Sequence, residues 1–256
     1  MMNDTLRVIH NRRSVRAYSD RPITREEKNE ILEATFRAPT AGNLMLYSII
    51  EVEAQEIKDR LAVTCDNQPF IARAPYILLF LADYQRWMDY FKQSGVSGLA
   101  ESLGVVERKP QTGDLLLACC DALIAAQTAV IAAESMGIGS CYIGDILEQY
   151  EIHRELFDLP PHTLPITMLC FGYPAVPGKK LTTRFDKEMI VHTDKYRRLS
   201  SDELGKGFAR LESDFRVGHH SSQYANAGQA VYFRKFASRF AAEMNRSVKE
   251  MLKNWE

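Results

Sequence analysis

The sequence lacks a cysteine framework, an excess of charge of either sign and an apolar leader at its start. Its five cysteines are odd in number, and none belongs to the C-x-x-C pairs that are typical of metal and redox sites. The formal net charge is −1, so composition gives no reason to expect nucleic acid or an anionic membrane as a partner. The first residues, MMNDTLRVIHNRRS, hold no apolar run long enough for a signal peptide. We therefore expect reduced thiols, no metal site and a cytoplasmic location.

What is present is the composition of an ordinary globular protein. Of the 256 residues, 46% are hydrophobic and 25% are charged. Beyond Ser200 the sequence shifts to charged helical segments with scattered aromatic side chains, which need a surface to cover. We expect residues 1–200 to form the main, ligand-binding domain. Residues 201–256 are expected to form a helical extension that packs on the core or on a partner subunit.

The longest uninterrupted apolar pattern runs from Asp114 to Met136 and contains neither proline nor glycine. Its apolar residues cover nearly the whole circumference, which predicts a buried helix about 35 Å long at a rise of roughly 1.5 Å per residue. A membrane span is the alternative. Because Asp121, Gln127 and Glu134 interrupt the apolar residues, we expect instead a central core helix, which a partner subunit could share.

Shorter apolar runs around this helix predict the strands of a sheet. Tyr76–Ala82, bounded by Pro75 and Asp83, is typical of a central strand covered on both faces. The other predicted strands are the end of Asn11–Ser19, Tyr47–Val52, Ser140–Tyr142 and Pro165–Phe171. The sequence therefore predicts an α+β fold, with a central mixed sheet of about five strands flanked by helices.

A positively charged segment, Arg12-Arg13-Ser14-Val15-Arg16, follows the first predicted helix. In an extended chain, Arg12, Ser14 and Arg16 project from one side of the backbone. Two guanidinium groups and a hydroxyl that converge on one point suit a phosphate, which arginine binds through paired hydrogen bonds. A solvated surface strand is the alternative interpretation, and the spacing alone favours it.

Three further stretches have the composition of ligand-binding turns. Ala38-Pro39-Thr40-Ala41-Gly42-Asn43 is a loop of small and hydrogen-bonding residues that could lie against a planar ligand, although most such loops only turn the chain. Tyr142-Ile143-Gly144-Asp145 ends a predicted strand in a glycine turn, which presents backbone N–H groups. Val176–Phe185 is a basic turn, normally solvated but available to an anion.

The order and spacing of these segments resemble the nitroreductase family, the FMN-dependent NAD(P)H oxidoreductases, and most closely its longer flavin-reductase-like branch. Arg12–Arg16 matches the family's R-S-x-R phosphate segment, and Ala38–Asn43 resembles its A-P-S-A-x-N loop near the isoalloxazine ring. Gln68 stands where this branch places a glutamine near the ring, and Gly144 lies in the turn whose backbone N–H faces flavin N5. Gly172-Tyr173-Pro174-Ala175 resembles the G-Y/W-P-A segment that precedes two basic residues near the phosphate.

The resemblance, over roughly residues 5 to 200, implies a set of FMN-binding residues. They are Arg12, Arg13, Ser14, Arg16, Pro39, Thr40, Ala41, Asn43, Gln68, Tyr142, Ile143, Gly144, Asp145, Lys180 and Arg184. The family usually places a lysine two residues before its arginine, but Thr182 stands two before Arg184, so Lys180 is the substitute in an uncertain register. Arg216 falls where the longer branch binds the 2′-phosphate of NADPH, and a solvated charge is the alternative there.

The implied reaction is a ping-pong transfer in which NADPH or NADH reduces FMN, and a nitroaromatic, a quinone or free flavin then reoxidises it. Because the flavin does the chemistry, no catalytic side chain is nominated, and only the backbone of Gly144 is expected near N5. The implied assembly is a nitroreductase-like homodimer through the long helix, with one FMN in each of two interface clefts.

Two alternatives to this function stay open. One is an FMN-dependent reductive dehalogenase or ring-fragmenting relative of the same fold. The other is a flavin-binding protein without enzymatic activity. Both would keep the predicted cofactor site, so only the response of the bound flavin to NAD(P)H and to a substrate separates them.

Overall fold

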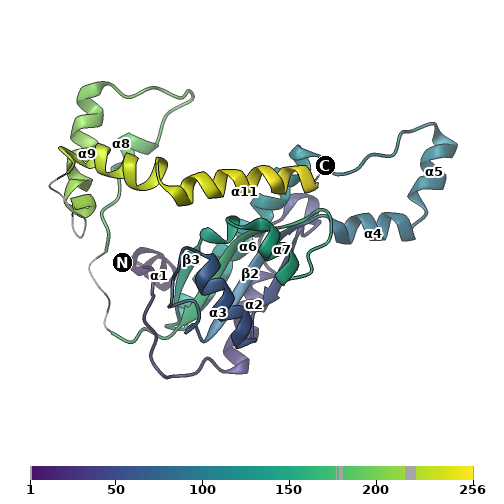
Figure 1. The fold of residues 1–256 in the computed structure, drawn as a ribbon, viewed down its shortest axis with the longest axis horizontal. Helices are drawn as coiled ribbons and strands as arrows, with labels where there is room; N and C mark the ends of the chain where they lie inside the picture. The colour runs from purple at the N-terminus through teal and green to yellow at the C-terminus, as the bar shows by residue number, and fades with distance from the viewer. Residues whose placement is uncertain (1, 177, 179–180, 217–222, 256) are drawn as a thin grey trace. The chain divides into compact units, whose positions relative to one another are not determined.

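The computed structural model describes residues 2–176, 178, 181–216 and 223–255, with the backbone alone at residues 213–216. The chain forms two compact units, Met1–Gly178 with Glu243–Glu256 and Lys179–Ala242. Figure 1 labels those of their helices and strands for which there is room. The domain boundary expected at residue 200 stays a prediction.

A four-stranded sheet in the order β1-β2-β4-β3 forms the centre of the larger unit (Figure 1). The strands are β1 (Tyr47–Glu51), β2 (Tyr76–Asp83), β3 (Gly139–Ile143) and β4 (Thr163–Gly172). All eight residues of β2 are buried, which confirms the prediction of a central strand covered on both faces. The α+β fold class is confirmed as well.

The sheet differs from the prediction in strand number and direction. Among the described residues it has four strands rather than five, and its three pairings are all antiparallel rather than mixed. The fifth strand was expected at the end of Asn11–Ser19, where the chain forms only two isolated bridges. Ser14 pairs with Ser140 in β3, and Tyr18 pairs with Pro174 beyond β4. Because this segment changes partner so quickly, it cannot build a ladder with either.

Helices cover both faces of the sheet, and the alternation of side chains along β2 separates the two sides. On one face, Leu78 and Phe80 pack with α2 (Arg25–Thr35) and α6 (Thr112–Ser135). On the other face, Leu79 packs with α3 (Gln55–Thr64). The remaining helices of this unit are α1 (Asp4–Asn11), η1 (Ala41–Asn43), α4 (Gln85–Gln93), α5 (Val96–Leu103), η2 (Asp145–Leu147), α7 (Tyr150–Leu156) and the greater part of α11 (Arg239–Trp255).

The central helix α6 is long and apolar enough to cross a membrane, with a mean hydropathy of 2.0 over its most apolar 18 residues. Its inner face nevertheless lies against the sheet, where Ala118, Ala122 and Ala129 are completely inaccessible to solvent. Small side chains allow this close approach. The predicted core helix is therefore confirmed on that face. The opposite face is open in the single chain, because Leu116, Leu117, Leu123 and Ile124 are 40–64% exposed.

The smaller unit contains α8 (Lys187–Ile190), α9 (Ser201–Arg216), α10 (Ala227–Val231) and the π-helical turn η3 (Tyr232–Phe236). Aromatic side chains hold it together, with the rings of Phe185 and Phe208 at 5.1 Å. Other aromatic side chains face solvent, and Phe236 is 75% exposed. This unit therefore has the aromatic surface expected of the C-terminal part of the sequence.

Candidate functional site

The predicted phosphate-binding segment runs along the edge of the sheet that β3 forms. The backbone N–H of Val15 donates to the carbonyl of Ser140 at 2.9 Å. A Cβ on Gly139 would lie 2.4 Å from Cγ2 of Val15, so this approach requires glycine. Burial raises the pKa of the neighbouring Cys141 thiol, and Arg16, Ser14 and Arg12 all oppose that shift. The three side chains therefore gather around one point of β3.

Arg12 has a buried side-chain donor without a hydrogen-bond partner. Its Nη1 atom is buried and has no hydrogen-bond acceptor in the structure. An unsatisfied buried donor costs about 1–3 kcal/mol, and more when it is charged, so an anion bound here would remove a real penalty. Beside it, the Arg13 guanidinium lies directly against the backbone of Gly178, where any Cβ would collide with it. The donor set therefore fits a phosphate monoester such as that of FMN.

Gln68 and the turn after β3 lie side by side, although 77 positions separate Gln68 from Asp145. The side-chain amide of Gln68 donates to Asp145 Oδ2 at 2.8 Å and to the carbonyl of Cys65 at 2.9 Å. Phe70 in the same loop lies under the Arg16 guanidinium, 5.8 Å from the ring centroid. These contacts join the Gln68 loop, the arginine segment and the turn into one cluster at β3.

Gly144 is the exposed residue of this turn, directly after β3. Its backbone has φ −79° and ψ −21°, and a Cβ there would meet nothing within 4 Å. The space above it is therefore open. The neighbouring Tyr142 is half-buried, its hydroxyl donates to Gln127 Oε1 at 3.2 Å, and burial raises its pKa to about 12. Tyr142 is thus a neutral hydrogen-bonding group at physiological pH.

The second predicted ring contact, the loop Pro39–Asn43, is held by α6. The Asp121 carboxylate accepts the backbone N–H of Ala41 at 2.9 Å and that of Leu46 at 3.1 Å. Backbone φ is positive at Gly42 and at Asn43, with values of 56° and 58°. Glycine and asparagine adopt this conformation more readily than other residues, so the two bonds to Asp121 hold a turn that the local sequence already favours.

Three residues that hold this loop or the segment directly after it were missed by the sequence analysis. Asp121 was counted only as an interruption of the apolar helix. Arg86 donates to the carbonyl of Tyr47 at 3.0 Å, and the indole N–H of Trp87 donates to that of Leu44 at 2.8 Å. The available signal was Asp121 itself, because a lone carboxylate on the buried face of an apolar helix needs internal donors. Nothing in the sequence marks Arg86 or Trp87.

The described contacts divide the predicted FMN-binding residues into two groups. The first surrounds β3 and contains Arg12, Arg13, Ser14, Arg16, Gln68, Tyr142, Ile143, Gly144 and Asp145. The second is the loop with Pro39, Thr40, Ala41 and Asn43, fastened to α6. No hydrogen bond joins the two groups within the described ranges. A ligand that touches both must bridge them, within one chain or between two.

The structure describes only some of the basic residues expected near the phosphate or the nucleotide. Arg184 belongs to the smaller unit, where it donates to its own loop, to the carbonyl of Thr183 at 3.3 Å and to the Thr182 hydroxyl. Lys180 lies outside the described residues, and so does the side chain of Arg216. Their predicted roles stay predictions.

Comparison with known proteins places these features in a family. A model of the nitroreductase family matches residues 9–173. The FMN reductase (NADPH) of Bacillus subtilis (strain 168) is 35% identical over 198 residues, which are 76% of this chain and 75% of that protein.

Solved structures agree with the sequence matches. The NfrA1 nitroreductase from B. subtilis has a TM-score of 0.79 and 29% identity, covering 98% of this chain and 100% of that one. The NADPH:FMN oxidoreductase from Vibrio harveyi, solved in complex with NAD+, has a TM-score of 0.77 and 26% identity, covering 98% of each chain. The family match spans both groups of predicted FMN-binding residues in the larger unit. The chain therefore belongs to the nitroreductase family.

Proposed function

We propose that this protein is an NAD(P)H-dependent flavin oxidoreductase that binds FMN and works as a homodimer in the cytoplasm. Family membership supports the enzyme class and the cofactor, as do relatives named FMN reductase and NADPH-flavin oxidoreductase. The structural observation that carries the proposal is the buried, unpartnered Nη1 of Arg12 near Arg16, in a segment that also contains Arg13. Three guanidinium groups in one segment, one of which has a donor without a partner, suit the terminal phosphate of FMN.

The residues of the two groups would hold different parts of the cofactor. Arg12, Arg13, Ser14 and Arg16 would bind the phosphate. Gln68 and the turn Tyr142–Asp145 would lie along one edge of the ring, and Pro39, Thr40, Ala41 and Asn43 would contact another part. Bound FMN would supply the redox chemistry, accepting a hydride from NADPH or NADH and passing electrons to a small-molecule acceptor.

The chain's own contribution to the reaction is binding and orientation. The backbone N–H of Gly144 would face N5 and align the ring for hydride arrival. Thr40 and Asn43 would add hydrogen bonds to the polar edge of the ring. Open space above Gly144 would admit a nicotinamide and then an acceptor in turn, as a ping-pong reaction requires. A nitroaromatic, a quinone or free flavin fits such an open position.

A second copy of the chain would complete the site. The exposed stripe on α6 formed by Leu116, Leu117, Leu123 and Ile124 has the apolar character of an obligate interface. Leu6 on the adjoining α1 adds to it, at 45% exposure. Dimerisation through α6 would bring the Pro39–Asn43 loop of one copy toward the β3 cluster of the other, which supplies the bridge between the two groups. The part of the C-terminal extension before α11 would embrace the partner, because the greater part of α11 packs on its own chain.

The cofactor site is tested by flavin binding. Purified protein should be yellow and release FMN rather than FAD, because the arginines gather at a single phosphate. Arg12→Ala should weaken FMN binding by about 1.5–3 kcal/mol, the range for hydrogen bonds to charged groups. Arg7→Ala is the matched control, since the Arg7 side chain is exposed and forms an ion pair with the exposed Asp4 at 3.1 Å. Colourless protein that cannot be reconstituted with FMN would end the proposal.

A further inference from the structure

The segment that follows Gly144 ends at a strained residue. Gln149 has φ 48° and ψ 44°, a left-handed conformation that is unfavourable for most non-glycine residues. Helix α7 begins at the next residue, Tyr150, and the Gln149 side chain does not cap it. The first N–H groups of a helix have no partner within the helix, so the start of α7 depends on acceptors from elsewhere.

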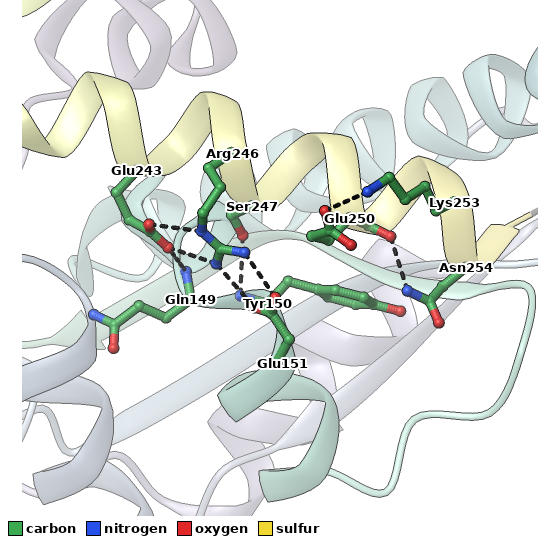
Figure 2. Close-up of polar contacts among 9 residues, drawn as sticks. All are labelled: Gln149, Tyr150, Glu151, Glu243, Arg246, Ser247, Glu250, Lys253 and Asn254. Carbon is green, nitrogen blue, oxygen red and sulfur yellow. Dashed lines mark hydrogen bonds and ion pairs between the residues drawn. The ribbon is translucent and has the colours of Figure 1, made fainter.

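Those acceptors come from the C-terminal helix α11, almost a hundred positions away. The backbone N–H of Gln149 donates to Glu243 Oε1 at 3.1 Å, and that of Tyr150 donates to the Ser247 hydroxyl at 3.0 Å (Figure 2). Ser247 is completely buried. The two acceptors from α11 thus serve the N–H groups of the N-cap residue Gln149 and of the first helical residue Tyr150.

Arg246 fixes the orientation of Glu243. Its guanidinium donates from Nε and Nη2 to both oxygens of Glu243, at 2.9 and 2.8 Å. It also makes a paired contact with Glu151 in the first turn of α7, at 2.7 and 2.9 Å (Figure 2), which lowers the pKa of Glu151 to about 2. Exposed ion pairs contribute little to stability, so their effect here is to aim the Glu243 carboxylate at Gln149.

The same short segment is held at its other end by Gln68. Two turn bonds connect Gly144 to Glu148, from the N–H of Leu147 to the Gly144 carbonyl at 3.1 Å and from the N–H of Glu148 to the Asp145 carbonyl at 3.0 Å. Asp145 accepts the Gln68 amide at 2.8 Å. The turn is therefore held at its start, beside Gly144, by Gln68, and at its end, at Gln149, by α11.

We propose that Glu243 and Ser247 are positioning residues that hold the Gly144 turn against the flavin ring from the C-terminal helix. This inference rests on the proposed function, which places Gly144 at N5. The end of α11 is firmly anchored, because Trp255 is completely buried and its indole N–H donates to the carbonyl of Gln111 at 3.1 Å. A rigid α11 thus fixes the start of α7, and the start of α7 limits where Gly144 can move.

The test compares variants along α11. Glu243→Ala and Ser247→Ala each remove an acceptor, whereas Glu243→Gln keeps an oxygen for the Gln149 N–H. Glu250→Ala is the matched control, because the Glu250 side chain pairs with Lys253 of the same helix at 2.7 Å (Figure 2). Two quantities are measured, namely the dissociation constant of FMN during reconstitution of the apoprotein and the single-turnover rate of flavin reduction at saturating NADPH.

Glu243→Ala and Ser247→Ala should raise the FMN dissociation constant about fivefold and slow reduction about tenfold. The dissociation constant of NADPH should stay within about twofold, because the nucleotide does not touch α11 in this account. Glu243→Gln should recover most of both losses, and Glu250→Ala should match the wild type. Glu243 is partly exposed, so its variants should remain folded, as thermal unfolding would check.

Wild-type values of both quantities in Glu243→Ala and Ser247→Ala would overturn the inference. Equal losses in Glu243→Ala and Glu243→Gln would overturn it as well, because the retained acceptor would then have no role. Failure of the proposed function looks different. In that case the wild-type protein itself would not bind FMN or would not be reduced by NADPH.

Discussion

Asp121 is the residue whose role the sequence hides most completely. The donors that explain it belong to Ala41 and Leu46, 80 and 75 positions away. Arg12, Ser14 and Arg16 are the opposite case, because a spacing of two in an extended chain already places their side chains on one side. Local periodicity is thus visible in a sequence, whereas a buried carboxylate bound to a distant loop is not. Which ligand the arginines bind stays a prediction until it is measured.

Asp121→Asn should loosen the Pro39–Asn43 loop. One of the two backbone N–H groups would face an amide NH2 instead of a carboxylate oxygen and would lose its acceptor. We expect a loss of about 1–3 kcal/mol in unfolding free energy and a weaker affinity for FMN. Chemical denaturation and FMN titration measure the two effects. Wild-type stability together with wild-type affinity would show that the loop does not depend on Asp121.

The backbone of Gly144 can be tested without disturbing its conformation. At φ −79°, and with open space at the Cβ position, Gly144→Ala should be tolerated and keep the N–H. Gly144→Pro fits the same φ but removes the donor. In flavin-loaded protein, the proline variant should therefore be reduced at least about tenfold more slowly than the alanine variant, or roughly 1.4 kcal/mol in barrier. Equal single-turnover rates would remove the N5 role from this turn.

Among helices and strands, the prediction succeeded for elements that are long and strongly apolar. The apolar runs that became α6 and β2 are long, and their burial follows from composition. The prediction of a strand at the end of Asn11–Ser19 was wrong, because strand pairing depends on partner segments that the local sequence does not contain. Ser14 and Tyr18 meet two different parts of the sheet, and no period of the segment itself reveals this.

The segment between η2 and α7 should make stability depend on pH. Glu148 is 4% exposed, and burial, followed by Asp145, Asp66 and Glu243, raises its pKa to about 7. The folded state thus favours protonated Glu148, while the unfolded chain ionises it near its usual value. Stability should therefore fall as pH rises from about 4.5 to about 7 and level off above 7. The total loss from this group is at most about 3.5 kcal/mol.

The variant Glu148→Gln isolates that contribution. Its amide cannot ionise, so unfolding free energies measured from pH 5 to pH 8 should show a shallower decline than in the wild type. The difference between the two proteins should be largest at the alkaline end of the range. Parallel curves for the two proteins would mean that Glu148 titrates normally and that another group sets the pH dependence.

The exposed apolar surface of α6 bears on how the whole molecule assembles. The apolar stripe on α6 is exposed in the single chain, and the proposed dimer would cover it. The proposed dimer would also bring the β3 cluster of one copy toward the Pro39–Asn43 loop of the other. The sequence predicted this helix as apolar on all sides but not which side the sheet would leave uncovered. That choice depends on how α6 packs against all four strands.

Leu123→Glu should break the proposed dimer. A charge in the middle of the apolar stripe would be buried without a partner, which is strongly unfavourable. Light scattering should then report monomers, and FMN should be lost with them because the site is shared. Lys249→Glu, a change of charge on the exposed surface of α11, serves as the control. A wild-type protein that is monomeric and fully loaded with FMN would refute this assembly.

Anaerobic single-turnover reduction tests most directly whether this chain uses NAD(P)H to reduce a bound flavin. Purified protein shown to hold FMN is mixed with NADPH or, separately, with NADH, and the absorbance of the flavin is followed. The flavin should bleach rapidly with at least one nucleotide, and its oxidised spectrum should return when a quinone or a nitroaromatic is added. Flavin that stays oxidised with both nucleotides would contradict the proposed function.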